Sequence, residues 1–239
     1  MHLIHAAAEE PEKLDRLKAA LHTLELPSGS PIHFEHGEPA EAILRVQNQY
    51  QIELLIAGAM ERESVHRNFT GDVARTLLRE APCDLLLFVE PQENAQPPAQ
   101  IFVAIPDFTP LSREAFLRST AFAEKVGAQE LTLLYVQSTF TEAKEKALGN
   151  EPQSVEDALE DWTRNRHQSN LNLETHSVRG NTGFTACEFI QSSAANLLVL
   201  PSYLGHPQRP VFAPVLDWVL QVIPTNLWVI RQVSEFVSA

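Results

Sequence analysis

The sequence predicts an α/β protein built from two tandem, doubly wound parallel-sheet domains. Short apolar runs alternate with stretches in which apolar residues recur at helical spacing, a pattern typical of a parallel sheet covered by helices on both faces. The order of these elements in the first part of the chain returns in the second part at nearly constant spacing, which indicates an internal repeat. A polar, proline-containing stretch separates the two repeats.

The first copy, residues 1–92, is predicted to alternate strands and helices from its first residues onward. Strands are expected at Leu3–Ala6, Pro31–His36, Glu53–Ile56 and Leu85–Val89. Helices are expected at Pro11–Leu24, Glu38–Tyr50 and Asp72–Glu80. The linker is placed at residues 93–98.

The second copy, residues 99–232, contains the same elements and an additional strand and helix at its start. Its strands are expected at Ile101–Ile105, Leu131–Val136, Leu171–Val178, Asn196–Leu200 and Leu227–Ile230. Its helices are expected at Ser112–Val126, Thr182–Ser193 and Val215–Val222, and the polar stretch Thr141–His167 is expected to be helical at both ends.

The two copies therefore begin differently. The first copy opens directly at the strand that corresponds to Leu131–Val136, so it lacks one leading βα unit. Either another chain or segment fills the gap in its sheet, or the polypeptide is a piece of something larger. The sequence leaves open whether Met1 is the natural start.

Composition excludes several classes of partner. The chain has 18 Lys and Arg residues against 31 Asp and Glu residues, a net charge of −13, which disfavours nucleic acid and anionic membranes. No apolar run approaches the length of a membrane-spanning helix, so we expect no membrane insertion. Two cysteines, Cys83 and Cys187, form no disulfide framework and are expected to be core thiols in a reducing, cytoplasmic compartment.

Several motifs in this order resemble the universal stress protein family. They are Asp107–Ser112 after an apolar strand, Gly37–Ile43 before a helix, Ala57-Gly58-Ala59, Gly71–Arg75, and Ala81-Pro82-Cys83. The resemblance covers nearly the whole chain as two tandem copies, of which the first is shortened.

The resemblance implies where ATP would bind. Nucleotide-binding members carry the signature Gly-x2-Gly-x9-Gly-(Ser/Thr), in which small residues and a helix N-terminus hold the phosphates. In the first copy these four positions hold Gly58, Glu61, Gly71 and Asp72, so two of them have become carboxylates. In the second copy they hold Pro201, Leu204, Ala213 and Pro214. We therefore expect both phosphate sites to be degenerate.

The resemblance also implies that Asp107 would lie beside adenine and ribose, with Ile105, Pro106 and Val136 lining the same place. An alternative role for Asp107 is that of a turn former or helix cap. No bound cofactor is expected. If one copy retains ATP, Mg²⁺ bridging Glu61 or Asp72 to phosphate would be the route.

No catalytic or metal-binding constellation is recognised. Strand alternation sends His33 and His36 to opposite faces, so they are not expected to share a metal. No Gly-x-Ser-x-Gly elbow occurs. We therefore expect the protein not to be an enzyme.

The favoured hypothesis is a tandem, non-catalytic cytoplasmic module for stress response or signalling. By the resemblance, Leu85–Val89 would pair with Leu227–Ile230 within one chain; a homodimer is the alternative. Two other functions stay open. One is the cytosolic C-terminal regulatory region of a cation/proton antiporter, with a transporter as partner, and the other is a stress protein that retains one ATP site.

Overall fold

The computed structural model describes residues 1–27, 29–58, 71–89, 96–137, 155–164, 171–179, 184–206 and 208–231. Its contacts divide the chain into two compact units, an N-terminal unit, Met1–Leu55, and a C-terminal unit, Ile56–Ala239. This division falls inside the first copy, because the last part of that copy joins the sheet of the second copy. The boundaries of the two repeats and their linker, residues 93–98, stay a prediction.

The N-terminal unit is a two-stranded parallel sheet with two helices. Its elements are β1 (Leu3–His5), α1 (Pro11–Thr23), β2 (Ile32–Phe34) and α2 (Pro39–Tyr50). β1 and β2 pair in register, with Leu3 opposite Ile32. Both helices begin at a proline, whose fixed φ and missing N–H suit the first turn.

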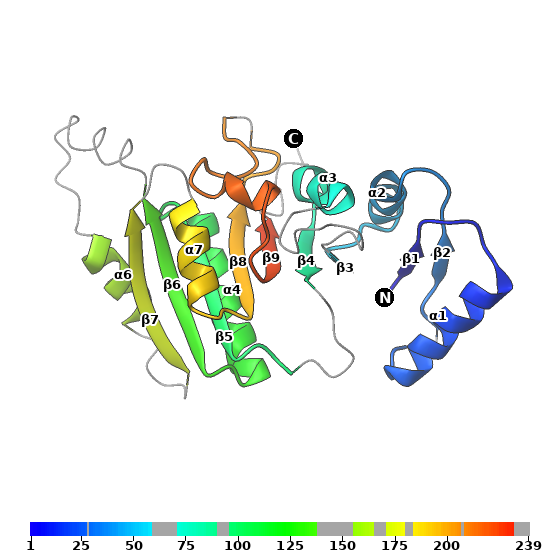
Figure 1. Cartoon of the computed structure of the whole chain (residues 1–239), viewed down its shortest axis with the longest axis horizontal. Coiled ribbons are helices and arrows are strands. Elements are labelled where there is room, and N and C mark those ends of the chain that lie inside the picture. Colours follow the sequence, from blue (N-terminus) through cyan, green and yellow to red (C-terminus); the bar gives the residue numbers. More distant parts are fainter. Residues whose placement is uncertain are drawn as a thin grey trace, which may run out of the picture. The chain divides into compact units, whose positions relative to one another are not determined.

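The C-terminal unit is organised around one seven-stranded sheet with the order β3-β4-β9-β8-β5-β6-β7 (Figure 1). Its strands are β3 (Leu54–Gly58, which spans the division between the units), β4 (Asp84–Phe88), β5 (Gln100–Ile105), β6 (Glu130–Gln137), β7 (Asn172–Arg179), β8 (Leu197–Ser202) and β9 (Asn226–Arg231). Its helices are α3 (Asp72–Glu80), α4 (Pro110–Val126), α6 (Val155–Thr163), α7 (Phe184–Ser192) and the 3₁₀ helix η1 (Asp217–Leu220).

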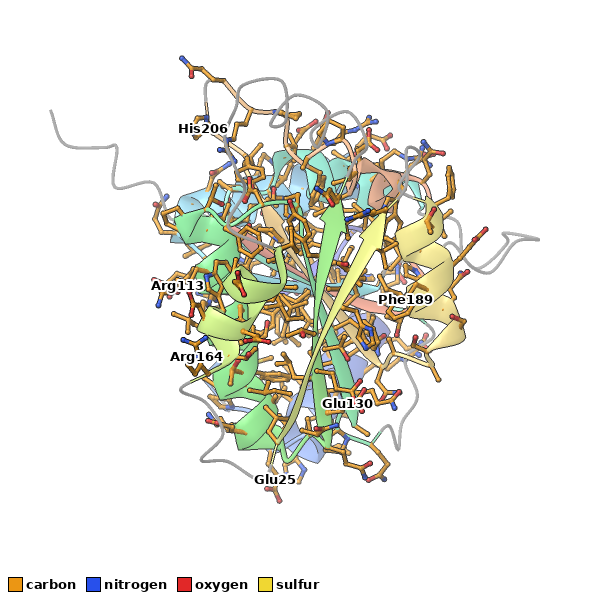
Figure 2. The ribbon with its side chains drawn as sticks, turned by 90° about the vertical axis from the view of Figure 1, so that its left-hand side faces the viewer. Glu25, Arg113, Glu130, Arg164, Phe189 and His206 are labelled. Atoms are coloured by element: carbon orange, nitrogen blue, oxygen red, sulfur yellow. The ribbon has the colours of Figure 1, made fainter. Side chains whose placement is uncertain are left out.

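Helices cover both faces of the second-copy sheet, as the apolar strands predict. Figure 2 shows Arg113 of α4 and Arg164 beside α6 on one side, and Phe189 of α7 on the other. On the α4 side, alternate residues of the strands pack with the helix in one buried cluster that includes Val103, Val199 and Phe116. β5, β6, β7, β8 and β9 are mutually parallel, which confirms the doubly wound arrangement of this copy.

The predicted pairing between the last strands of the two copies is confirmed. β4 runs antiparallel to β9, with Leu85 opposite Val229 and Leu87 opposite Leu227. The side chain of Asn226 extends this seam, because its Oδ1 accepts a hydrogen bond from the Val89 N–H at 2.9 Å. The two copies therefore share one sheet through their final strands.

A buried ionic cluster lies beside this seam. Arg231, 3% exposed, donates to the Ser202 hydroxyl and to the carbonyl of Leu78 at 2.7 Å, at the end of α3. The Asp84 carboxylate accepts from the Arg231 backbone N–H at 3.1 Å, from Trp228 Nε1 at 3.2 Å and from Arg118. Side chains of the second copy thus satisfy the end of a helix and a buried acid of the first.

Two predicted elements differ from the structure. The helix expected at Val215–Val222 is wrong: turns lead into η1, which spans only Asp217–Leu220. Pro214 and Pro224 bracket this stretch, and Trp218 Nε1 donates to the Val215 carbonyl at 3.1 Å, so the local hydrogen bonds favour tight turns. In the polar stretch Thr141–His167, the second of the two expected helices is α6, which starts at Val155. The helix expected at the beginning of this stretch lies outside the described residues.

Across the described residues, the search for a helix both long and apolar enough to traverse a bilayer finds none. Cys83 and Cys187 are both buried, as expected of core thiols, and burial raises the pKa of Cys187 to about 11.

Candidate functional site: the aspartate at the end of strand β5

Asp107 stands where the central strand of the second copy ends. β5 brings the buried Ile105 to the C-terminal edge of the sheet, where it pairs with Tyr135 of β6. Pro106 then breaks the ladder, and the chain turns into α4, whose N-cap is Thr109. Thr109 Oγ1 accepts the Ser112 N–H, which fixes the turn that holds Asp107.

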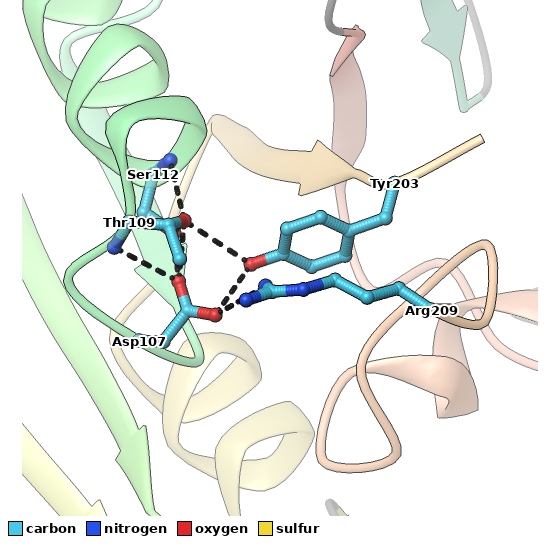
Figure 3. A network of polar contacts seen from close by, with 5 residues as sticks. All are labelled: Asp107, Thr109, Ser112, Tyr203 and Arg209. Atoms are coloured by element: carbon cyan, nitrogen blue, oxygen red, sulfur yellow. Dashed lines mark hydrogen bonds and ion pairs between the residues drawn. The ribbon is translucent and has the colours of Figure 1, made fainter. Parts of the chain in front are cut away.

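The Asp107 carboxylate is surrounded by donors from its own chain (Figure 3). Its Oδ1 accepts from the Thr109 hydroxyl at 2.7 Å, the Thr109 N–H at 3.2 Å and the Ser112 hydroxyl at 2.8 Å. Its Oδ2 accepts from the Tyr203 hydroxyl at 2.8 Å and from Arg209 Nη1 at 2.9 Å. A carboxylate offers about four lone-pair positions, so these contacts saturate it.

The environment keeps Asp107 ionised. Burial alone would raise the pKa of this carboxyl, but the hydrogen bonds from Thr109, Tyr203 and Ser112 outweigh burial and leave the pKa below its usual value. Burial raises the pKa of the Tyr203 phenol, so it stays a donor at neutral pH. The Asp107 carboxylate is therefore held in one orientation by hydrogen bonds, and its charge is paired with that of Arg209.

Arg209 comes from the loop that follows β8. The loop is folded back on itself, since Tyr203 N–H donates to the Val211 carbonyl at 2.8 Å and Ser202 donates to the same carbonyl at 3.0 Å. The guanidinium of Arg209 lies over the Tyr203 ring, 4.6 Å from its centroid, and forms an ion pair with Asp107. The loop thereby places a cation against Asp107, the residue that the family resemblance implies beside adenine and ribose.

Of the neighbouring predicted residues, Ile105 and Val136 are buried and Pro106 is half-buried. Val136 is 2% exposed within β6, and next to it the ring of Tyr135 stacks on Phe108 at 5.0 Å. Trp162 of α6 meets Phe108 edge-on at 5.3 Å. A cavity of about 210 Å³ beside these rings is lined by Phe108, Ala158, Asp161 and Trp162.

Tyr203 and Arg209 were missed by the sequence reasoning. Both reach Asp107 across about 100 residues of chain through a loop whose course no local pattern determines. The signal that the sequence offers there is the proline-rich loop itself, with Pro207 and Pro210 on either side of Arg209.

The other predicted positions lie in the first copy. Gly58 ends β3, where a Cβ would meet no atom of the described residues within 4 Å, and Gly71 caps α3 with extended backbone angles. Asp72 begins that helix; its side chain is 85% exposed and accepts from Arg75 Nη1 at 3.1 Å. Glu61 lies outside the described residues.

The structure therefore separates the two halves of the site that the family resemblance implies. The second copy holds the strand end, Ile105–Asp107, together with Val136, whereas its phosphate-side helix is reduced to η1. The first copy holds a full helix, α3, behind Gly71 and Asp72, but begins at β1 and has no strand equivalent to β5 among its described residues. Within the part of the chain that the structure describes, no cluster of three or more His, Cys, Asp or Glu side chains is placed to hold a metal.

Comparison with known proteins agrees with the fold. Residues 2–88 match the model of the family described as the universal stress protein family. No curated protein sequence matches the chain.

Two solved structures resemble the whole chain. A candidate universal stress protein from Pseudomonas aeruginosa UCBPP-PA14 has a TM-score of 0.68 at 14% identity, with 96% of this chain and 82% of that chain covered. A universal stress protein from Archaeoglobus fulgidus DSM 4304 has a TM-score of 0.57 at 13% identity, with 94% and 81% covered. At these identities the likeness establishes the shared fold.

Proposed function

We propose that this chain, whose residues 2–88 match the universal stress protein family, is throughout its length a non-catalytic cytoplasmic module of that family for stress response or signalling, and that its second copy does not bind ATP. The observation that carries the proposal is the saturated carboxylate of Asp107. A ribose hydroxyl could bond to that carboxylate only by displacing Tyr203 or Arg209, since no acceptor position is left over.

The phosphate side of the second copy supports the same conclusion. A helix N-terminus binds phosphate through free N–H groups and the aligned dipoles of the turns behind them. η1 has four residues, and Pro214 stands before it without an N–H to offer. The second copy therefore lacks most of the groups that would hold a triphosphate.

Charge disfavours ATP in the first copy. Asp72 occupies the hydroxyl position at the start of α3, and its carboxylate would face the phosphates. Two like charges about 4 Å apart repel by about 1 kcal/mol in water and about 4 kcal/mol near a protein surface. Arg75 offsets part of this charge through its ion pair with Asp72, but that pair already uses the cation.

Isothermal titration of the full chain with ATP and Mg²⁺ tests the proposal. We expect no saturable heat for the wild type, and micromolar binding would contradict the account. The double variant Tyr203→Phe with Arg209→Ala removes both donors to Oδ2, so it measures how far those side chains close the site.

Two single variants assign any binding that does occur. Loss of binding in Asp107→Ala would place ATP in the second copy, and a change in Asp72→Ala would place it in the first. Because Asp72 is exposed, its replacement is expected to leave the fold intact, so a change in binding would report on the first-copy site itself.

A further inference from the structure

Phe108 and Trp162 form a corner of two aromatic rings in the C-terminal unit. Phe108 lies in the turn after β5, and Trp162 belongs to α6. Their ring planes are perpendicular, at 90°, and their centroids are 5.3 Å apart. Both residues are half-buried, whereas Phe116, on which Trp162 stacks, is 1% exposed. The corner therefore packs against the core on one side and keeps part of its surface accessible.

The cavity lined by these two rings has a volume of about 210 Å³, and its other walls come from α6. Ala158 stands three residues before Asp161 and four before Trp162, so all three side chains lie along the same part of the helix surface. Ala158 contributes only a methyl group, and Asp161 contributes a carboxylate. The cavity thus combines aromatic surface with a small residue and an acid.

Helix α6 is strongly acidic. Its nine residues include Glu156, Asp157, Glu160 and Asp161 and no lysine or arginine. Asp161 Oδ1 accepts from Arg164 Nη1 at 3.0 Å, and the two side chains are 48% and 65% exposed. An ion pair this exposed contributes little, so a cation in the cavity can compete with Arg164 for the carboxylate. The charge around the cavity therefore favours a cation over an anion.

We propose that this cavity binds a small organic cation that carries a quaternary ammonium group. The faces of aromatic rings attract cations electrostatically, and cages of such rings recognise quaternary ammonium groups. A quaternary ammonium group has no N–H to donate, so it suits walls made of two rings, a methyl group and one carboxylate. A primary ammonium group has three donors, which these walls cannot all satisfy.

The cavity is separate from the nucleotide position that the family resemblance implies. Tyr135 and Val136 are successive residues of β6, so their side chains point to opposite faces of the sheet. Phe108 stacks on Tyr135 in the cluster on the α4 side, whereas Val136 is the residue implied beside adenine. The cavity shares no side chain with the Asp107 network, and its lining residues all belong to the C-terminal unit. Its test is therefore independent of whether ATP binds.

Choline and tetramethylammonium, titrated separately into the ¹⁵N-labelled full chain, are the direct probes. We expect saturable shifts of the Trp162 indole N–H signal, which the variant Trp162→Phe identifies by its absence. The matched control ligand is the neutral analogue of choline in which a carbon atom replaces the nitrogen, and it should not bind. Sodium chloride at the same concentrations controls for ionic strength.

Four variants locate the bound cation. Ala158→Leu places a larger side chain in the cavity and should abolish the saturable shifts. Phe108→Leu stays apolar but loses the ring, so binding should weaken by about fivefold. Asp161→Asn should weaken binding by about two- to fivefold. Its matched control is Glu160→Gln, which removes the same charge from α6 at a side chain that is 69% exposed and does not line the cavity.

The proposal is overturned if neither cation gives saturable shifts up to about 50 mM, or if the neutral analogue binds equally well. It is also overturned if Asp161→Asn and Glu160→Gln weaken binding equally, because the acidic helix would then attract any cation. Binding that is unchanged in Ala158→Leu or Phe108→Leu would place the cation elsewhere and contradict the role of the rings.

Discussion

The two copies of the repeat differ in which half of the implied nucleotide site they contain. The first copy has a full helix, α3, after Gly71, but no leading strand and helix in its described residues. The second copy has β5 and α4, yet the stretch corresponding to α3 is the single turn η1. A nucleotide site of the kind implied by the family resemblance needs both halves in one copy, so the comparison supports the proposal that neither copy binds ATP.

The same comparison shows two different surroundings for the matching residues. In the second copy, the strand end is a closed polar network in which Asp107 is fully satisfied. In the first copy, Asp72 is exposed, and so are Leu54 and Ile56. The second copy satisfies its acid from within the chain, whereas the acid of the first copy faces solvent.

The largest expected effect concerns the cluster that joins the copies. Asp84→Ala would leave Arg231 buried with a backbone N–H and an indole N–H unpaired beside it, so we expect a loss of about 3–5 kcal/mol in the free energy of unfolding. Urea denaturation measures it, with the exposed Glu80→Ala as control. A loss near that of the control would mean that the seam does not depend on this carboxylate.

The comparison between β8 and β3 predicts unequal costs for one substitution. Leu197→Ala removes a buried side chain and should cost about 2–5 kcal/mol. Leu54→Ala removes a half-exposed one at the matching position and should cost less than about 1 kcal/mol. Equal losses in the free energy of unfolding, measured by urea denaturation, would show that Leu54 is buried in solution and would contradict this difference between β3 and β8.

The two aspartates are expected to differ in the same way. Asp107→Ala breaks charge-assisted hydrogen bonds and strands their donors, so it should cost about 2–3 kcal/mol. Asp72→Ala at the exposed start of α3 should stay within about 0.5 kcal/mol. If Asp107→Ala proved neutral or stabilising in thermal unfolding, the carboxylate would be held for a ligand and not for the fold.

The smallest expected effect is a pH dependence of the N-terminal unit. His33 accepts or donates one ring hydrogen bond with His2 at 2.9 Å, and both rings lie against Tyr50. Burial, and next the charge of His2, lower the pKa of His33, while Glu35 raises it. The unfolded chain therefore takes up this proton at a higher pH than the folded chain.

The corresponding stability is present above the ordinary histidine pKa and is lost as the pH falls below it. The protection factors of the amides in β1 and β2, which are the intrinsic exchange rates divided by the observed rates, should fall from about pH 7.5 to about pH 5.5, and His33→Asn should flatten this dependence. Protection factors that rise as the pH falls would contradict the assignment.

Much of the fold could be predicted because its signals are local. The apolar runs identify the strands, and the helix expected at Asp72–Glu80 ends at the predicted residues. The seam between Leu85–Val89 and Leu227–Ile230 was expected from the family resemblance and is present. The elements themselves depend on neighbours in sequence, whereas the seam depends on the likeness of the whole chain to that family.

The rest depends on contacts between distant residues. Val215–Val222 has helical spacing, but Pro214, Pro224 and the Trp218 side chain favour turns there. Asp107 could be found as a candidate, yet its partners Tyr203 and Arg209 come from a loop with no periodic pattern. Whether that aspartate is free or saturated could therefore not be predicted from the sequence.

Nuclear magnetic resonance of the ¹⁵N-labelled chain, titrated with ATP and Mg²⁺, tests the central claim most directly, because it observes both copies at once. The account predicts no change in the amide chemical shifts of Asp107 and Thr109 in the second copy up to millimolar nucleotide. The amide chemical shifts of Gly71 and Asp72 in the first copy are expected to stay unchanged as well. Saturable shifts at either pair would show that one copy still assembles a complete site and would contradict the account.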